Sequence, residues 1–315
     1  MADELRFDGR VVLVTGAGGG LGAEYAKLLA QRGARVVVND IGGVDAEAQE
    51  GASAAGIVAQ IEAAGGEAVA DTHSVATADG GRAMVAHALE HFGRLDAVVN
   101  NAGIGRTGSG FSDISDEQLD LVLRTHLYGA FHVLRPAWRI MCEQGYGRVV
   151  NTASSTAIGV DDSWDYPAAK GGVVSLTRCL AITGEHHDIK VNAIMPLAYT
   201  PMSAQVPSDE IRGWMKRTFP AETVAPTVAL LCHEAAPCTG EIFSVGAGRT
   251  ARVTYAVVPG FKTREPTMEA LRDNWSDVLD TEGLVLAGSG AVDAGLFGVG
   301  FDDLGTTRMA SDSKN

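Results

Sequence analysis

The sequence predicts an α/β fold: a doubly wound parallel sheet of seven strands flanked by helices, with a C-terminal extension. Short β-branched runs alternate along the chain with segments of helical length, and parallel strands need such crossover connections. The first run also leads directly into a glycine-rich turn, which is typical of a buried strand followed by a helix.

The strands are expected near residues 10–15, 35–39, 67–71, 96–100, 147–153, 189–195 and 240–245. A solvated loop is expected from Gly42 to Gly56, before a helix around residues 57–61. Further helices are expected over residues 116–143 and 165–183.

The alternation of strands and helices stops after Gly248. We therefore expect a dinucleotide-binding domain over residues 1–248 and an extension over residues 249–315, packed on that domain or on a partner subunit. The extension should begin as a strand-like segment to Phe261, continue with a short helix near residues 268–279 and end loosely after Gly283.

The glycine-rich turn spans residues 15–22. Glycines lack Cβ, so the backbone can approach phosphate oxygens, and the helix that follows supplies unpaired N–H groups. The turn therefore predicts a dinucleotide site in a Rossmann-type fold, with an ordinary tight connection as the alternative.

Asp40 ends the second expected strand, eighteen positions after Gly22. A carboxylate at this place accepts hydrogen bonds from both ribose hydroxyls and repels a 2′-phosphate. No Arg or Lys follows until Arg82, so the sequence favours NAD over NADP. The alternative is a strand-end Asp in a turn, because Gly42 and Gly43 follow.

Composition excludes several classes of partner. The net charge of -14 over 315 residues argues against a nucleic acid or an anionic membrane surface. No apolar stretch reaches the roughly 18 residues of a membrane span. The four cysteines form no disulfide framework and no ligand-like pair, so no metal site is expected. Without a leader, and without a final Leu in Ser313-Lys314-Asn315, the protein is expected to be cytoplasmic.

Tyr166 and Lys170 lie four positions apart, and Pro167 places the start of their helix beside Tyr166. An adjacent ammonium favours the phenolate, which can take the proton of an alcohol as hydride leaves the carbon. Ser154, at the end of the fifth strand, can donate a hydrogen bond to the substrate oxygen. A capping role for Ser154, or the use of Ser155 instead, is the alternative.

With Asn100-Asn101-Ala102-Gly103 at the end of the fourth strand, these motifs resemble the short-chain dehydrogenase/reductase family over residues 10–170. The resemblance implies four catalytic residues, Tyr166, Lys170, Ser154 and His126. It also implies a set of cofactor-binding residues, namely Thr15, Gly16, Gly18, Gly20, Leu21, Gly22, Asp40, Ser74, Val75, Asn101, Ala102, Gly103, Tyr166, Lys170, Pro196 and Thr200.

Within the family, the chain is similar to the (3R)-hydroxyacyl-CoA dehydrogenase part of peroxisomal multifunctional enzymes of type 2. The likeness includes residues 37–43, 125–129, 245–248 and 267–275. It implies NAD-dependent oxidation of an acyl-CoA alcohol by a homodimer or homotetramer. A hydroxysteroid or another hydrophobic alcohol is the alternative substrate, and an NAD-binding scaffold or sensor is the non-enzyme alternative.

Three positions depart from the family pattern. His126 replaces the usual Asn; its imidazole can hold a water in the path to Lys170, or it is a satisfied helix histidine. The spacing from Ser154 to Tyr166 is one residue short, so the acidic loop over residues 160–165 is expected to line the substrate mouth. Leu197 replaces a usual Gly, but Thr200 can still bind the nicotinamide carboxamide.

Overall fold

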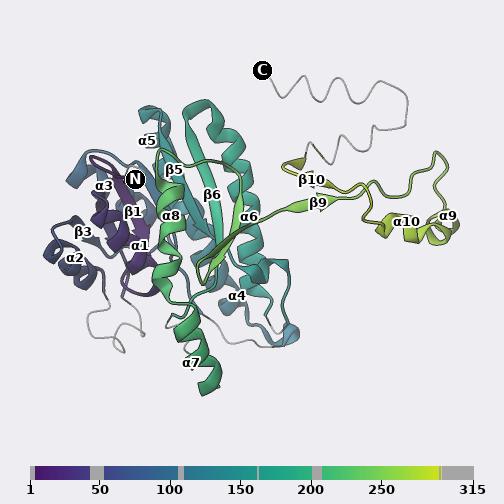
Figure 1. Ribbon diagram of the computed structural model, residues 1–315, viewed down its shortest axis with the longest axis horizontal. Coiled ribbons are helices and arrows are strands. Elements are labelled where there is room, and N and C mark those ends of the chain that lie inside the picture. The colour runs from purple at the N-terminus through teal and green to yellow at the C-terminus, as the bar shows by residue number, and fades with distance from the viewer. Residues whose placement is uncertain are drawn as a thin grey trace. The chain divides into compact units, whose positions relative to one another are not determined.

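The computed structural model describes residues 4–42, 53–105, 110–161, 163–200, 208–290 and 292. Most of the expected loop before residue 54 and of the tail after Gly283 lies outside these residues. The chain divides into two compact units, Met1–Arg252 and Val253–Asn315. The first unit is a three-layer α/β structure, in which helices cover both faces of one sheet (Figure 1).

The sheet has eight strands in the order β3-β2-β1-β4-β5-β6-β7-β8. The strands β1 to β7 pair in parallel. Their bounds are β1 (Val11–Thr15), β2 (Arg35–Asn39), β3 (Glu67–Asp71), β4 (Ala97–Asn100), β5 (Gly147–Thr152), β6 (Ile189–Pro196), β7 (Ile242–Gly246) and β8 (Arg249–Val253). The predicted fold class is confirmed, and the strand order reverses between β1 and β4.

The eighth strand differs from the expectation of seven. Between β7 and β8 the chain turns on Ala247 and Gly248, which both have positive φ, at 49° and 75°. Two successive residues with positive φ match the twist of a two-residue hairpin. The turn thus brings β8, the first part of the expected extension, onto the edge of the sheet.

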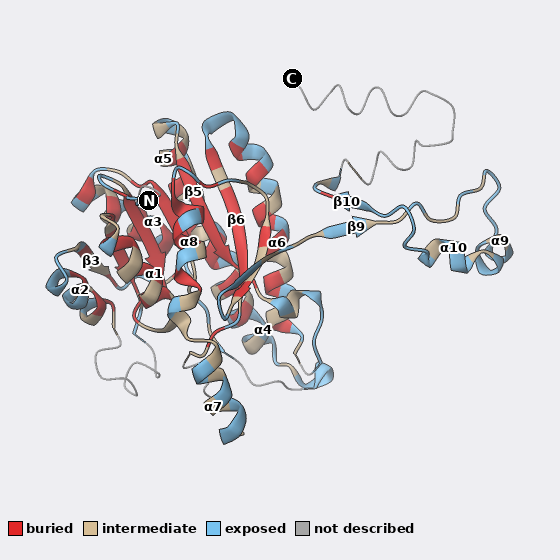
Figure 2. Cartoon of the chain, viewed as in Figure 1, coloured by how far each residue is buried: buried red, intermediate tan, exposed pale blue. Residues whose placement is uncertain are grey.

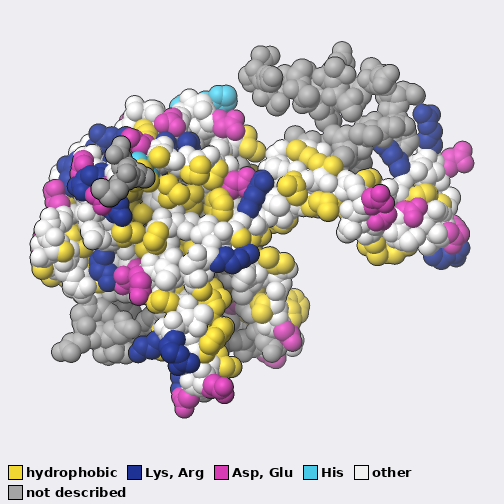
Figure 3. All heavy atoms as spheres, viewed as in Figure 1, with side chains coloured by type: hydrophobic (Ala, Val, Ile, Leu, Met, Phe, Trp, Pro, Cys, Tyr) yellow, Lys and Arg dark blue, Asp and Glu magenta, His cyan; other side chains and the backbone are white. Residues whose placement is uncertain are grey.

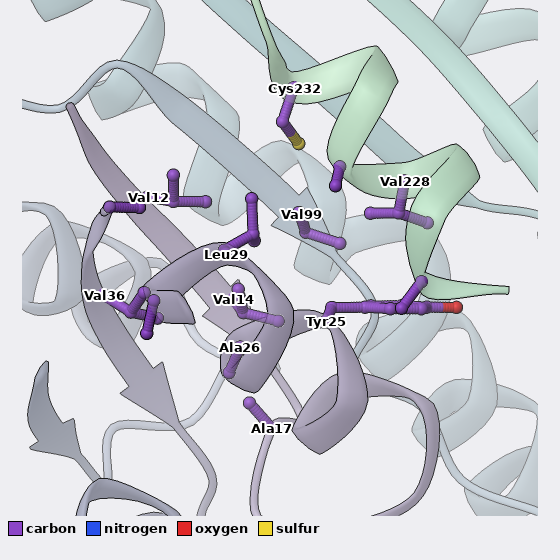
Figure 4. Packing of buried hydrophobic residues seen from close by; sticks show 14 of the residues in the cluster. Val12, Val14, Ala17, Tyr25, Ala26, Leu29, Val36, Val99, Val228 and Cys232 are labelled. Carbon is purple, nitrogen blue, oxygen red and sulfur yellow. The ribbon is translucent and has the colours of Figure 1, made fainter. Parts of the chain in front are cut away.

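Two apolar clusters hold the helices to the sheet (Figure 2). One face carries α1 (Gly20–Gln31), α2 (Ala54–Ala63) and α8 (Ala225–Cys232). The other carries α3 (Ala78–Phe92), α5 (Gly129–Gln144) and α6 (Asp165–Gly184). Because successive residues of a strand point to opposite faces, Val12 and Val14 belong to the first cluster and Leu13 to the second. Figure 4 shows Tyr25 of α1 beside the helix that carries Val228.

The expected helix over residues 116–143 is interrupted. It consists of α4 (Asp116–Leu123), a π-helical segment over Arg124–Tyr128, and α5. Segments of this type are frequent at functional sites. Helix α7 (Asp209–Thr218) of the first unit belongs to neither layer. Its described residues are all at least partly exposed.

The second unit contains a small antiparallel pair, β9 (Tyr255–Val257) with β10 (Val285–Ala287). Between these strands lie α9 (Met268–Asp273) and α10 (Trp275–Leu279), where one short helix was expected. The helix is split because Asn274 leaves helical geometry. Of all the helices described, none is long and apolar enough to cross a membrane.

Candidate active site

The carboxyl ends of β1 and β4 are fastened to each other at the point where the strand order reverses. The Thr15 hydroxyl accepts hydrogen bonds from the backbone N–H groups of Asn101 and Ala102, both at 3.0 Å. The Asn101 amide donates in return to the carbonyls of Thr15 and Gly16. In open α/β sheets a crevice at this point is where ligands bind.

The glycine turn packs so closely that side chains do not fit. A Cβ on Gly16, whose φ is +63°, would lie 2.7 Å from the Ala102 Cα, and a Cβ on Gly22 would lie 2.3 Å from the Gly16 carbonyl oxygen. Gly20 begins α1, and Leu21 packs against the core beside it. No side chain among the described residues caps this helix start. Its first-turn N–H groups therefore have no side-chain partner among these residues.

Asp40 reaches from the end of β2 to the glycine turn. One carboxylate oxygen accepts a hydrogen bond from the Gly18 N–H and the other from the Gly42 N–H, both at 2.9 Å. The bond with Gly42 is the contact of a strand-end Asp in a turn, which is the alternative role given above for Asp40. Each oxygen of an ionised carboxylate still has a lone pair for a ribose hydroxyl.

The residues after β3 lie next to Asp40, whose N–H donates to the Asp71 carbonyl. Val75 is buried, and its carbonyl accepts a hydrogen bond from His132 of α5, while Ser74 accepts one from the Ala76 N–H. These contacts fix the segment at the adenine end of the expected cofactor path.

Sequence analysis missed a polar cluster beneath that segment. The buried Asp71 carboxylate accepts hydrogen bonds from the Asn39 amide at 2.6 Å and from the His73 backbone, and it contacts the His73 ring at 2.8 Å. An acid at the end of β3, two residues before a His, was the available signal. Its partner Asn39 belongs to another strand, and the two residues meet only because their strands pair in the sheet.

Tyr166 and Ser154 lie together at the end of β5. The Ser154 hydroxyl caps a short 3₁₀ helix, accepting from the Thr156 N–H at 3.2 Å, and it is hydrogen-bonded to the Tyr166 phenol. Burial raises the pKa of Tyr166, whereas the bond with Ser154 lowers it. Ser155 is exposed, so Ser154 is the serine beside the phenol.

Lys170 is buried below the Tyr166 ring. Its Nζ donates to the Thr152 carbonyl at 2.6 Å and lies 5.5 Å from the ring centroid. Burial lowers the pKa of Lys170 to about 7. The ammonium is therefore close to neutralisation at the pH of the cell, and small changes in its surroundings alter its charge.

His126 lies in the π-helical segment, edge-to-face with Tyr166 at 4.9 Å between ring centroids. Its Nε2 contacts the backbone N and O of Ile104 at 3.2 and 3.1 Å. Burial, with the charge of Lys170, lowers the pKa of His126 to about 3, so the ring is neutral. Gly103 leaves room for this ring, because a Cβ there would lie 2.6 Å from its Cε1.

A cavity of about 10 Å³ lies behind these side chains, lined by His126, Lys170 and Thr152 among others, and about this volume holds one water. Within the described part of the chain, the buried His126 Nδ1 and the Thr152 hydroxyl have no hydrogen-bond partner. His126 is thus satisfied at one ring nitrogen only. A phenol, a hydroxyl and an ammonium at one place can hold an alcohol and move its proton.

The last expected residues follow β6. Pro196 ends the strand opposite Val245, and the exposed Leu197 follows it. Thr200 comes after Tyr199, whose N–H donates to the Phe219 carbonyl. Residues 201–207, which follow Thr200, lie outside the described residues.

The acidic loop differs from its expectation at Asp165, whereas Asp161 is exposed. Asp165 is 4% exposed and does not line the mouth, because its carboxylate accepts hydrogen bonds from the Gln118 amide and the Tyr166 N–H. Asp162 lies outside the described residues. No cluster of three or more His, Cys, Asp or Glu within the described segments can hold a metal ion.

Comparisons with known proteins agree with this geometry. A family profile described as short chain dehydrogenase matches residues 10–211. The chain is 47% identical over 288 residues to peroxisomal multifunctional enzyme type 2 of Mus musculus, covering 89% of this chain and 38% of the mouse protein. It is 43% identical over 282 residues to a short-chain type dehydrogenase/reductase of Mycobacterium tuberculosis, covering 89% of this chain and 97% of the other.

Solved structures give the same result. The full-length peroxisomal multifunctional enzyme type 2 of Drosophila melanogaster superposes with a TM-score of 0.77 at 34% identity, covering 93% of this chain and 49% of that one. A short chain dehydrogenase of Mycobacterium avium superposes with a TM-score of 0.74 at 37% identity, covering 87% of this chain and 97% of the other. The chain thus spans less than half of the mouse and Drosophila multifunctional enzymes.

Proposed function

We propose that this chain, which belongs to the short-chain dehydrogenase/reductase family, is an NAD-dependent dehydrogenase that oxidises a secondary alcohol, a (3R)-hydroxyacyl-CoA, to the ketone. Family and relatives make it an oxidoreductase acting on CH–OH groups. The observation that carries the proposal is the assembly of Ser154, Tyr166 and Lys170 at one end of β5. The acyl-CoA substrate class rests on the likeness to the multifunctional enzymes.

The crevice fits a nicotinamide dinucleotide. The closely packed glycines, the uncapped start of α1 and the Asp40 carboxylate follow one another along the carboxyl edge of the sheet. In that arrangement the turn would hold the pyrophosphate, Asp40 the adenosine ribose, and Lys170 the nicotinamide ribose. Asp40 supports NAD rather than NADP, because its charge repels a 2′-phosphate.

The residues of the site divide the chemistry among them. When bound, the nicotinamide supplies the acceptor for the hydride that leaves the carbinol carbon. Tyr166, as phenolate, takes the hydroxyl proton, and Ser154 orients the substrate oxygen by hydrogen bonding. Lys170, below the ring, favours the phenolate while it is charged. His126 is neutral, and its unpartnered Nδ1 can accept a hydrogen bond from a water in the cavity that His126 lines with Lys170.

The test is NADH formation at 340 nm with purified protein, NAD⁺ or NADP⁺, and matched (3R)- and (3S)-hydroxyacyl-CoAs. Hydroxysteroids and simple secondary alcohols complete the panel. We expect turnover of the (3R)-thioesters with NAD⁺. Turnover of steroids or other alcohols alone would overturn the acyl-CoA assignment and leave a dehydrogenase of another hydrophobic alcohol. Silence with every alcohol would favour an NAD-binding scaffold or sensor.

Two properties of the protein in the cell remain predictions. We propose a homodimer or homotetramer, which light scattering would contradict by showing only a 32.8 kDa particle. We also propose a cytoplasmic location without a nucleic-acid or membrane partner. Acidic and basic side chains are interspersed on the face in Figure 3. Because the mouse and Drosophila relatives are named as peroxisomal enzymes, imaging of a fluorescent fusion decides the compartment.

A further inference from the structure

Four large apolar side chains are exposed around the candidate active site. Phe111 is 75% and Ile158 73% exposed, and Val160 and Trp164 are exposed to 47% and 37%. Single exposed apolar residues are ordinary on a protein surface, but a group beside a catalytic crevice marks a surface that binds an apolar partner.

The chain itself places these residues at the reacting groups. Ile158 ends the 3₁₀ helix that Ser154 caps, and Trp164 comes two residues before Tyr166. Phe111 comes from the segment before α4 and meets Trp164 edge-to-face, with ring centroids 5.5 Å apart and an interplanar angle of 74°. Two segments distant in sequence thus form one apolar wall.

A partly buried hydrogen bond holds the two sides of this wall together. The Gln118 amide of α4 donates to the Asp165 carboxylate at 3.0 Å, and the other oxygen of that carboxylate accepts from the Tyr166 N–H at 2.7 Å. Gln118 therefore ties α4, and with it the segment of Phe111, to the first turn of α6. The same carboxylate fixes the backbone of Tyr166.

We propose that Phe111 and Trp164, with Ile158 and Val160, form the wall that binds the hydrocarbon chain of the substrate, and that the Gln118–Asp165 hydrogen bond positions it. This inference rests on the proposed function and specifies its substrate as one with a chain long enough to cover the wall. A hydrocarbon chain is the occupant because Asp165 is turned inward and the large side chains exposed here, which reach farthest from the backbone, are apolar, although Asp161 of the same loop is exposed as well. Each buried methylene then raises affinity by about fourfold.

The experiment is calorimetry with saturated acyl-CoAs from butanoyl- to dodecanoyl-CoA, together with kcat/KM for the hydroxyacyl-CoAs of the same lengths. The wild type should gain about fourfold in affinity for each methylene that reaches the wall. In Trp164→Ala and Phe111→Ala the gain per methylene should fall below about twofold, so that the loss of affinity and of kcat/KM relative to the wild type grows with chain length. Leu5→Ala, an exposed apolar truncation at the opposite edge of the sheet, should behave as wild type.

The Gln118–Asp165 hydrogen bond is tested with a matched pair of variants at Asp165. Asp165→Asn keeps an acceptor for the Tyr166 N–H, and its kcat should stay close to the wild-type value. Asp165→Ala removes both bonds, so it should lose chain-length preference as the wall variants do and lower kcat as well. Gln118→Ala should lose the preference while keeping kcat. Circular dichroism and thermal unfolding establish that each variant folds.

The outcomes separate the two proposals. Affinities that do not change with chain length in the wild type, or an equal loss for all lengths in the variants, would overturn the wall. Absence of NADH with every hydroxyacyl-CoA would overturn the proposed substrate, whereas length-dependent binding of the saturated thioesters would still support the wall.

Discussion

The carboxylate of Asp40 accepts a hydrogen bond from the Gly18 N–H at 2.9 Å, which joins the end of β2 to the glycine turn after β1. Only glycine allows this approach, because a Cβ on Gly18 would lie 2.8 Å from the Asp40 Cγ. The acid that favours NAD and the turn that would hold its pyrophosphate are therefore one structural unit. A substitution of either Asp40 or Gly18 should therefore disturb the proposed contacts with both the ribose and the pyrophosphate of NAD.

Asp40→Ala is expected to weaken NAD⁺ binding by about tenfold to a hundredfold, because it removes a charged acceptor and leaves two N–H groups without it. The preference for NAD⁺ over NADP⁺ should fall at the same time. Dissociation constants from fluorescence titration with NADH and NADPH measure both effects. Gly18→Ala should shift NADH affinity in the same direction. An unchanged ratio of the two affinities in Asp40→Ala would contradict the role of Asp40.

Tyr166→Phe is expected to lower kcat by about a thousandfold, the scale on which general acid–base catalysis contributes, while NAD⁺ still binds. The variant keeps the ring that packs against His126 and lies over Lys170, so its fold should be intact. NADH formation at 340 nm measures the loss. Tyr128→Phe, which removes an exposed phenol, is the control and should retain activity. Substantial turnover by Tyr166→Phe would exclude Tyr166 as the base.

Ser154→Ala is expected to move the pH profile of kcat/KM toward higher pH, in addition to lowering the rate. The base form of Tyr166 is the phenolate, so activity rises as pH rises through its pKa. The bond with Ser154 lowers that pKa against the effect of burial, and its loss therefore raises the pKa. Values of kcat/KM measured from pH 6 to about 10.5 locate the pH range over which activity rises. A profile that keeps its midpoint while losing amplitude would show that Ser154 acts only on the substrate.

The buried His126 is expected to make the protein lose stability in acid. Folding lowers the pKa of His126 from 6.5 to about 3, so between these values the unfolded chain binds a proton that the folded chain does not. Stability contributed in this way is present above pH 6.5 and is lost as pH falls toward 3.

His126→Asn lacks this titration. Between pH 7 and pH 4.5 the wild type should therefore lose about 2 kcal/mol more of its free energy of unfolding than the variant does. Urea unfolding at the two pH values measures both losses, and every other titrating group is common to the two proteins. Equal losses would show that His126 titrates normally in the folded state.

Asp96→Asn is expected to destabilise the fold by about 3 kcal/mol. Asp96 is 1% exposed at the amino-terminal edge of the sheet, where its carboxylate accepts from the Val11 N–H and from the guanidinium groups of Arg10 and Arg94. Neutralising it leaves two cations with a weaker acceptor. Chemical denaturation measures the loss, and the exposed Asp79→Asn serves as control with a change within about 0.5 kcal/mol.

The strands of the sheet were predictable because their signal is local. Runs such as Val36–Val38 are β-branched, buried on both faces and bounded by turns, and each of the seven expected strands is present. The glycine turn, Asp40 and the pair of Tyr166 and Lys170 were likewise visible, because the chemistry requires their spacing along one strand–turn–helix unit or one helix face.

What the sequence by itself determined is thus the fold class and the residue types at the carboxyl edge of the sheet. The tertiary structure alone decided which of them meet. Gln118 meets Asp165 and Phe111 meets Trp164 across about fifty residues of chain, so Asp165 of the acidic loop is turned inward while Trp164 of the same loop joins an apolar contact. His126 becomes neutral only because neighbouring elements bury it beside Lys170. Burial and contact between distant segments arise from packing, which no local pattern of residues encodes.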